Sequence, residues 1–281
     1  MDLKAAKAPI HLDYVPQFYC KPGVSTGSAL HRPAFWEIHH MSLDRYFTAI
    51  GKVKGEHEIL RLRHQMAFLY KSVDFRGKTV LDIGGGTGYH ALYAAACGAK
   101  SAVIIEPEAD GSQNTMIQTF NVFKTEMGID NVELLKTTIQ EYEIPAGGFD
   151  VVLIQNAINH FDEPACVTLR ESAESQAAYR KIFKSIAELL KTGGILIMSD
   201  CSSNNLFPKL GMKNPIDPSI EWEKHQPPSE WAKVAAPEDL ILEEVRWSSP
   251  TRFGKIGQLI IGNAIGAWFF TSHFVATLRL K

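Results

Sequence analysis

One stretch decides the fold that this chain predicts: Thr79-Val80-Leu81-Asp82-Ile83-Gly84-Gly85-Gly86-Thr87-Gly88-Tyr89-His90. A short run of β-branched and aliphatic residues contains an acid near its end, and glycines then occupy alternate positions. The apolar run predicts a buried strand, and the glycines predict a tight turn that a ligand can approach closely. The alanine-rich segment 91–96 predicts a helix packed on a sheet. Strand, turn and helix N-terminus together predict a nucleotide-binding corner.

The spacing of the glycines indicates which nucleotide the corner binds. A dinucleotide site prefers G-x-G-x-x-G, and Tyr89 stands where that pattern has its third glycine. This counts against an NAD(P)-dependent oxidoreductase, which remains the alternative enzyme class. Asp82, followed by G-x-G-x-G at Gly84, Gly86 and Gly88, resembles motif I of the class I S-adenosylmethionine-dependent methyltransferases.

Two further phrases carry the same resemblance. Phe149-Asp150-Val151-Val152, followed by polar residues, is similar to motif IV of that family and the loop after it. Leu189-Leu190-Lys191-Thr192-Gly193-Gly194-Ile195-Leu196 is similar to the family's phrase before its fifth strand. Here the paired glycines predict a helix C-cap directly before a strand from Ile195 to Asp200.

The resemblance covers about residues 73–281 and implies an α/β fold, a Rossmann-like sheet of seven strands with flanking helices. Residues 201–235 are rich in turn residues and are expected to form a lid within this domain. Residues 1–72 lie outside the resemblance and predict an N-terminal arm followed by a helical cap. Apolar residues recur at helical spacing in two segments there, 35–47 and 59–70. Such a cap could cover the acceptor substrate or pair two subunits as a homodimer.

Composition limits the partners. The chain of 281 residues is 45% hydrophobic and 21% charged, with a formal net charge of −2 and no block of Lys or Arg, which gives no reason to expect a nucleic-acid partner. The four cysteines form no C-x-x-C pair and predict reduced thiols in a cytoplasmic protein; they are Cys20, Cys97, Cys166 and Cys201.

The most apolar segment, Ile256 to Phe270, is short for a membrane span and contains Gln258 and Asn263. It predicts a buried helix leading into a strand, so no membrane partner is expected.

The resemblance also implies which residues hold S-adenosylmethionine and its product S-adenosylhomocysteine. Glu106 ends the second predicted strand and is placed to bind the ribose hydroxyls. Thr138 occupies a position where the family often has an acid for the adenine amino group, and Ile139 is placed to pack on the ring. Gln155 and Asn156 are expected to face the methionine end. The full set of cofactor candidates is Asp82, Gly84, Gly86, Gly88, Glu106, Thr138, Ile139, Gln155 and Asn156.

Methyl transfer to a hydroxyl calls for a base near the methyl group. His160, in the loop after the fourth strand, is the first candidate, although it could equally cap or pack beneath the lid. His225, in the predicted lid, is the second. Asp200 could bind the substrate or simply end a strand. Asp162 and Asp200 belong to no compact ligand set, so no metal is expected.

The sequence therefore predicts S-adenosylmethionine-dependent methyl transfer to a small-molecule acceptor. The expected reaction is O-methylation of a hydroxyl on a sugar or secondary-metabolite intermediate. A non-catalytic S-adenosylmethionine-binding scaffold remains an alternative beside the oxidoreductase, because fold does not fix function.

Overall fold

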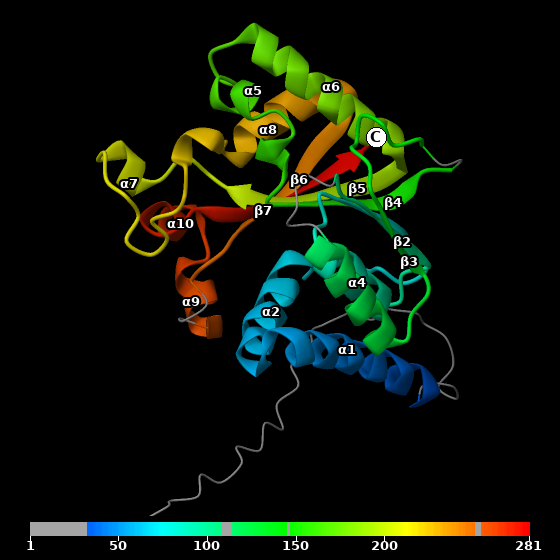
Figure 1. Ribbon diagram of the computed structural model, residues 1–281. Helices are drawn as coiled ribbons and strands as arrows, with labels where there is room; N and C mark the ends of the chain where they lie inside the picture. Colours follow the sequence, from blue (N-terminus) through cyan, green and yellow to red (C-terminus); the bar gives the residue numbers. More distant parts are fainter. Residues whose placement is uncertain (1–32, 108–113, 145–146, 251–253) are drawn as a thin grey trace, which may run out of the picture.

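The computed structural model describes residues 33–107, 114–144, 147–250 and 254–281 (Figure 1). The predicted arm before residue 33 lies outside them. In chain order the elements, with η marking short 3-10 helices, are α1 (Pro33–Lys54), α2 (Glu56–Leu69), β1 (Thr79–Ile83), α3 (Tyr89–Ala96), β2 (Ser101–Ile105), α4 (Asn114–Met127), β3 (Val132–Leu135), β4 (Phe149–Gln155), η1 (Ile158–His160), α5 (Glu163–Val167), α6 (Ala173–Leu189), β5 (Leu190–Cys201), α7 (Leu206–Lys209), η2 (Trp222–Lys224), α8 (Pro228–Ala235), η3 (Ala236–Glu238), β6 (Leu240–Trp247), α9 (Gly254–Ile261), α10 (Ala264–Phe269) and β7 (His273–Leu280).

The strands form one seven-stranded sheet in the order β3-β2-β1-β4-β5-β7-β6. Strands β1 to β5 pair in parallel, and β7 is antiparallel to both of its neighbours, β5 and β6. The Rossmann-like methyltransferase sheet predicted from the sequence is confirmed. Because β1 lies between β2 and β4, the glycine turn after it stands at the centre of the carboxyl edge.

Helices cover both faces of the sheet, α1 to α4 on one and α5, α6 and α8 on the other (Figure 1). Alternation along the strands assigns side chains to the two cores. Val80 and Val151 belong to the first core, and Leu81 and Val152 belong to the second. The predicted N-terminal helices are present, and residues 43–70 contribute to the first core. The helical cap thus shares a hydrophobic core with the sheet.

The glycine pair Gly193-Gly194 does not end a helix, so the C-cap prediction is wrong. Helix α6 ends at Leu189, and β5 begins at once because Leu190 is already extended and pairs with Phe149. The pairing then jumps to Val151 with Ile195, which makes the intervening glycines part of an irregularity inside the strand. The expected lid segment 201–235 contains α7, η2 and α8; its role as a lid stays a prediction.

The prediction of a buried helix over Ile256–Phe270 is also wrong. The segment forms two short helices, α9 and α10, separated at Gly262 and Asn263. The Asn263 side chain accepts hydrogen bonds from the backbone N–H groups of Ile265 and Gly266, which starts a new helix there. Many of its apolar side chains face solvent, Leu259 at 86% exposure. Among the described helices, none has the length and apolar character needed to cross a membrane.

The glycine turn needs its glycines for two separate reasons. Gly84, Gly86 and Gly88 have φ of 68°, 54° and 81°, in the left-handed region that other residues rarely adopt. A Cβ at Gly88 would also lie 2.7 Å from Ile104 Cδ1 and 2.9 Å from Phe120 Cδ2, so α4 and β2 close tightly over the turn.

Gly88→Ala separates these two costs when it is compared with Gly77→Ala. Gly77 has φ of 67° and nothing within 4 Å of the place where a Cβ would lie. Gly77→Ala should therefore lower the free energy of unfolding only by the cost of a left-handed backbone, about 1–2 kcal/mol. Gly88→Ala should lower the free energy of unfolding by about 1–3 kcal/mol more than Gly77→Ala does, because Ile104 and Phe120 must move. Urea unfolding of both variants measures the difference. Equal losses of unfolding free energy in the two variants would show that Ile104 and Phe120 move away from the new Cβ at no cost.

Candidate functional site

The Asp82 carboxylate supports the glycine turn from below. It is fully buried and accepts a hydrogen bond from the Ala91 backbone N–H in the first turn of α3, at 3.2 Å. A Cβ at Gly85 would lie 2.7 Å from its Cγ, so the turn rests directly on the carboxyl group. Burial, together with the nearby Glu106 charge, raises the pKa of Asp82 to about 7. Asp82 therefore positions the turn.

Glu106 lies against the same turn from the end of β2. Its Oε2 accepts a hydrogen bond from the Gly86 backbone N–H at 2.9 Å. On the outer side of Gly86 the nearest atom to a Cβ position is Met116 Sδ, at 3.8 Å, so the backbone there is not crowded. The acid and the glycine turn, 20 residues apart in the sequence, form one corner as the ribose hypothesis requires.

The segment after β3 supplies a carboxylate that the sequence reasoning missed. Thr138 Oγ1 donates to Glu141 Oε2 at 3.0 Å, so an acid stands beside the position where the family pattern has one. A carboxylate three residues after Thr138 was the available signal. Ile139 is buried in the second core with Ile83 and Ile105, beneath the ends of β1 and β2.

Gln155 and Asn156 end β4 in different environments. Gln155 is buried, its Nε2 donates to the Ile197 backbone carbonyl at 3.1 Å, and its Oε1 has no partner among the described residues. Asn156 has φ of 53°, and its backbone N–H donates to the Ser199 carbonyl at 2.8 Å. That turn exposes its side chain to a large cavity.

This larger cavity, of about 1120 Å³, lies at the carboxyl ends of β4 and β5. Helix α2 lines one side, the end of β6 and the start of β7 line another, and α9 contributes Leu259. Asn156, Ser199, Asp200 and His273 line its inner end. Ligands of open α/β sheets bind at this edge, so the cavity is the candidate acceptor site.

Asp200 is the most unusual side chain of that inner end. It is 1% exposed, and its Oδ1 accepts from the Cys201 backbone N–H at 2.7 Å and from His225 Nδ1 at 2.9 Å. Its Oδ2 has no hydrogen-bond partner among the described residues. Burial lowers the pKa of the neighbouring His273, which favours a neutral ring. A buried carboxylate oxygen without a hydrogen-bond partner destabilises the folded protein. A bound molecule that donates a hydrogen bond to Oδ2 would remove this cost.

The two candidate bases are in different places. His225 backs the buried Asp200, and its side chain is 17% exposed. His160 is 59% exposed, and its Nδ1 lies 2.6 Å from Glu163 Oε1. The other carboxylate oxygen of Glu163, Oε2, pairs with Lys224. His160 does not line the larger cavity. His225 does not line that cavity either, but it contacts Asp200, which does. The catalytic roles of His160 and His225 both stay predictions.

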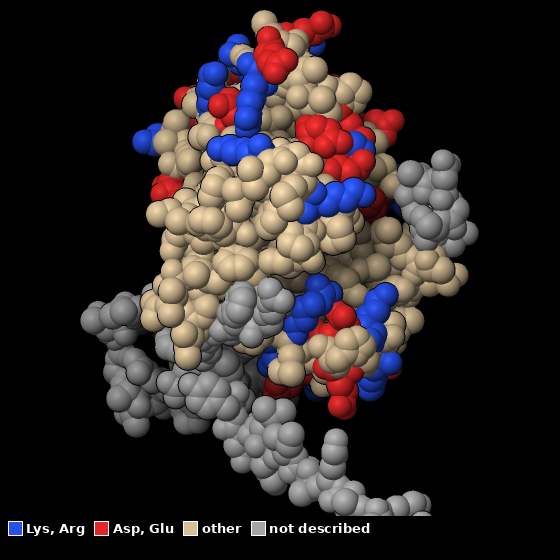
Figure 2. All heavy atoms as spheres, turned by 90° about the vertical axis from the view of Figure 1, so that its left-hand side faces the viewer, with Lys and Arg blue, Asp and Glu red and all other residues tan. Residues whose placement is uncertain are grey.

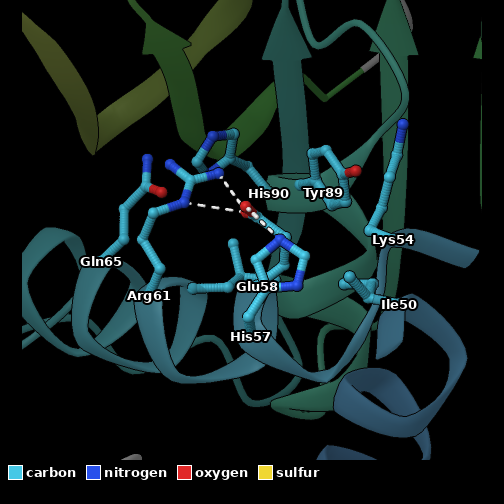
Figure 3. Close-up of a pocket in the computed structure, with 9 residues that line it drawn as sticks. Ile50, Lys54, His57, Glu58, Arg61, Gln65, Tyr89 and His90 are labelled. Carbon is cyan, nitrogen blue, oxygen red and sulfur yellow. Dashed lines mark hydrogen bonds and ion pairs between the residues drawn. The ribbon is translucent and has the colours of Figure 1, made fainter. Parts of the chain in front are cut away.

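A smaller cavity of about 460 Å³ lies between α2 and the start of α3 (Figure 3). Glu58 and Arg61 project into it from α2, where they form an ion pair, and Tyr89 and His90 face them across it. Arg61 and Gln65 line both cavities, so the polar stripe of α2 joins them. The sequence reasoning missed these α2 residues, although their spacing by three and four places them on one helix face.

His90 is tied to the helical cap by Tyr70. Burial raises the pKa of Tyr70 well above 10 and lowers the pKa of His90 to about 4, so the tyrosine keeps its proton and the imidazole is neutral. Tyr70 Oη therefore donates to His90 Nδ1 at 2.9 Å, and His90 carries its own proton on Nε2. Tyr46 Oη donates to the Tyr89 carbonyl at 3.0 Å, which is a second bond from cap to turn.

His90 and Asp82 make opposite contributions to stability on acidification. The pKa of His90 is lowered from 6.5 to about 4, so between these pH values the unfolded chain binds a proton that the native protein does not. The free energy of unfolding therefore decreases as the pH falls from 6.5 to 4. The pKa of Asp82 is raised from 3.8 to about 7, so between these pH values the native protein binds a proton that the unfolded chain does not. The free energy of unfolding therefore decreases as the pH rises from 3.8 to 7.

We expect Asp82→Asn to make the free energy of unfolding fall more steeply than in the wild type between about pH 6 and pH 4.5. The difference is at most about 1.4 kcal/mol per pH unit, because the opposing Asp82 contribution is gone. His90→Gln should change the slope in the opposite direction. Urea unfolding at several pH values measures the slopes, and two variants that both keep the wild-type slope would contradict these pKa values.

Among the described residues, no group of three or more His, Cys, Asp and Glu side chains could hold a metal ion. The described cysteines, Cys97, Cys166 and Cys201, are free and buried. Burial raises the pKa of the Cys166 thiol to about 12, which keeps that thiol protonated. The site is thus built from carboxylates, histidines and backbone groups.

Comparison with solved structures supports the fold. The chain superimposes on a putative S-adenosylmethionine-dependent methyltransferase from Listeria monocytogenes with a TM-score of 0.56, at 16% identity, over 79% of this chain and 99% of that one. For a methyltransferase from Aquifex aeolicus the TM-score is 0.53, at 14% identity, over 84% of this chain and 98% of that one.

Curated relatives match over shorter stretches. Protein arginine N-methyltransferase 1 of Chlamydomonas reinhardtii is 32% identical over 135 residues, which is 46% of this chain and 38% of the relative. The uncharacterized methyltransferase YcgJ of Bacillus subtilis is 22% identical over 161 residues, which is 57% of this chain and 55% of the relative. The chain thus spans about half or less of the length of these relatives.

The family model described as a methyltransferase domain matches residues 54–240, from the end of α1 to the start of β6. The match includes the glycine turn, Glu106, Asp200 and His225. The chain therefore belongs to the methyltransferase-domain family, an enzyme family whose cofactor is S-adenosylmethionine.

Proposed function

We propose that the protein transfers a methyl group from S-adenosylmethionine to a hydroxyl group of a small-molecule acceptor bound in the larger cavity. The acceptor class we favour is a sugar or secondary-metabolite intermediate. One observation carries the proposal: a cavity of about 1120 Å³ at the carboxyl ends of β4 and β5 contains the buried, partly unpaired carboxylate of Asp200. Cavities of this size suit small molecules.

The corner between β1 and β2 fits the cofactor. Gly84 and Gly85 have no room for a Cβ, which would lie 2.9 Å from Ala157 Cβ and 2.7 Å from the Asp82 carboxylate, so only a bare backbone can form this cradle. We assign the ribose hydroxyls to Glu106, and the adenine to Ile139 with Thr138 and Glu141. Asn156, beside Gln155, would face the methionine end. When bound, S-adenosylmethionine supplies a methyl group on a positively charged sulfur, and its transfer to a nucleophile would release the neutral thioether S-adenosylhomocysteine.

Asp200 and His225 would handle the acceptor's proton. The free Oδ2 of Asp200 would accept a hydrogen bond from the acceptor hydroxyl and orient it. His225 Nδ1 donates to Oδ1, so the imidazole fixes the carboxylate and stabilises its charge. The proton then leaves the hydroxyl for this pair as the oxygen becomes the nucleophile.

Nitrogen methylation is the second candidate, because one relative is an arginine N-methyltransferase and because an unpaired carboxylate also attracts a guanidinium. The acceptor search therefore includes an arginine-rich peptide beside hydroxylated small molecules, each with methyl-labelled S-adenosylmethionine. Label in the peptide alone would overturn the proposal of a small-molecule hydroxyl. Cofactor binding without transfer to any acceptor would favour the scaffold.

Glu106→Gln should weaken S-adenosylhomocysteine binding by about 10- to 100-fold, because the amide forms weaker bonds to the ribose hydroxyls than a carboxylate. Calorimetric titration measures the affinity without an acceptor. Glu133→Gln, which changes an exposed acid of β3, is the matched control and should bind as the wild type does. Unchanged affinity in Glu106→Gln would remove the ribose assignment, and binding of NADH in place of the thioether would overturn the cofactor assignment.

With an acceptor in hand, Asp200→Asn should lower kcat by about 100- to 10,000-fold while S-adenosylhomocysteine affinity is retained, because the amide takes no proton. His225→Gln should cause a smaller loss, since the carboxylate keeps its bond to Cys201 N–H. His160→Ala is the discriminating variant. A loss of turnover in His160→Ala, with Asp200→Asn active, would assign the base to His160.

A further inference from the structure

Exposed apolar side chains gather on one side of the molecule. Eight of the thirteen large hydrophobic side chains exposed on the described residues lie between 210 and 216 or between 256 and 269. Helix α10 contacts both α7 and α9, so these residues form one surface. We call it the apolar face; its members are Leu210, Met212, Ile216, Ile256, Leu259, Ile260, Ile265 and Phe269. Figure 2 views the molecule from this side and shows a broad area without charged residues between charged margins.

Helix α9 has the reverse of the usual polarity. The Gln258 side chain points inward, where Oε1 accepts from Ser249 N–H at 3.0 Å and Nε2 donates to the Trp247 carbonyl at 2.7 Å. Ile256 and Ile260 face outward at 73% and 65% exposure. Helix α9 is therefore attached to the rest of the protein through Gln258, and its apolar stripe faces solvent. An exposed apolar stripe of this kind indicates a binding surface.

Charge indicates what covers it. Residues 203–216, which contribute Leu210, Met212 and Ile216 to the apolar face, contain Lys209 and Lys213 and no acid, within a chain whose net charge is −2. The Lys209 ammonium lies 5.8 Å from the centre of the Trp268 ring, at the edge of the apolar face. Isoleucine, leucine and aromatic side chains with basic residues around them are typical of segments that lie in the surface of an anionic bilayer. A second copy of this face would instead bring like charges together.

The apolar face reaches the larger cavity. Leu259 is 86% exposed and also lines the cavity, so this side chain stands where the two meet. Gly262 and Asn263, between the two helices, line the cavity as well. A molecule dissolved in the bilayer could therefore pass from the lipid to Asp200 along one continuous wall.

We propose that the apolar face docks the protein on anionic lipid bilayers and that the acceptor is a lipid-soluble molecule carrying a hydroxyl group. The acceptor part rests on the proposed function, and the docking part does not. The expectation of no membrane partner rested on the short length and polar residues of Ile256–Phe270 and on its predicted burial, and the structure contradicts the burial. The face would enter the interface without spanning the bilayer.

Sedimentation with vesicles tests the docking. The full chain should bind phosphatidylglycerol vesicles at least about 10-fold more tightly than phosphatidylcholine vesicles, and salt should weaken the binding. The double variant Ile256→Glu/Ile265→Glu should reduce binding at least about 10-fold, because it places charges on the stripe that enters the lipid. Leu60→Glu/Val122→Glu is the matched control, with two exposed apolar side chains on α2 and α4 replaced, and should bind as the wild type does. Lys209→Glu/Lys213→Glu should lose the preference for phosphatidylglycerol.

Absence of vesicle binding, or binding that the Ile256→Glu/Ile265→Glu variant leaves unchanged, would overturn the docking proposal. A dimer in lipid-free buffer that the same variant abolishes would assign the face to a second copy and overturn it as well. S-adenosylhomocysteine affinity, measured on the same variants, keeps this result separate from the proposed function: lost vesicle binding with retained thioether binding confirms docking by this face. Vesicle binding by a wild type that does not bind the thioether would support docking and contradict the methyltransferase proposal.

Discussion

A buried carboxylate under a backbone that has no room for a side chain is the constraint on which the site depends. Asp82 has no solvent exposure, and the hydrogen bond from Ala91 N–H sets the first turn of α3 relative to β1. The positive end of that helix offsets part of the cost of burying the charge. Gly85 lies directly on the carboxyl group. Strand, turn and helix are therefore fixed as one unit, and the ligand side of the turn is left as bare backbone.

The strand order converts this local unit into a two-part site. Because β1 lies between β2 and β4, the corner formed with Glu106 faces the β2–β3 half of the sheet, and Asn156 faces the β4–β5 half. The cavity with Asp200 lies on that second half. Helix α2 joins the two, since Arg61 and Gln65 line both cavities. The N-terminal helices are thus part of the site, tied to the turn by Tyr46 and Tyr70.

The sequence predicted what depends on local pattern. The strand predicted before the glycine turn is β1, and the strand predicted from Ile195 to Asp200 lies within β5. The contact of Glu106 with the glycine turn agrees with the spacing of 20 residues between them. The contact of His225 with Asp200 could not be predicted, because it joins a loop to a strand end 25 residues away and depends on how 201–235 folds back. The irregularity at Gly193-Gly194 was missed for a similar reason: strand pairing with Phe149, a long-range contact, overrides the helix-capping preference of glycine.

Apolarity alone also failed to distinguish a core from a surface, and α9 shows why. Ile256 and Ile260 would predict burial in any hydrophobicity scale, yet Gln258 makes the inward bonds to Ser249 and Trp247. These hydrogen bonds hold α9 in this orientation and leave its apolar stripe facing outward. The same helix contributes the outer face and, through Leu259, the cavity wall. Whatever covers the face therefore also lies beside the cavity that contains Asp200.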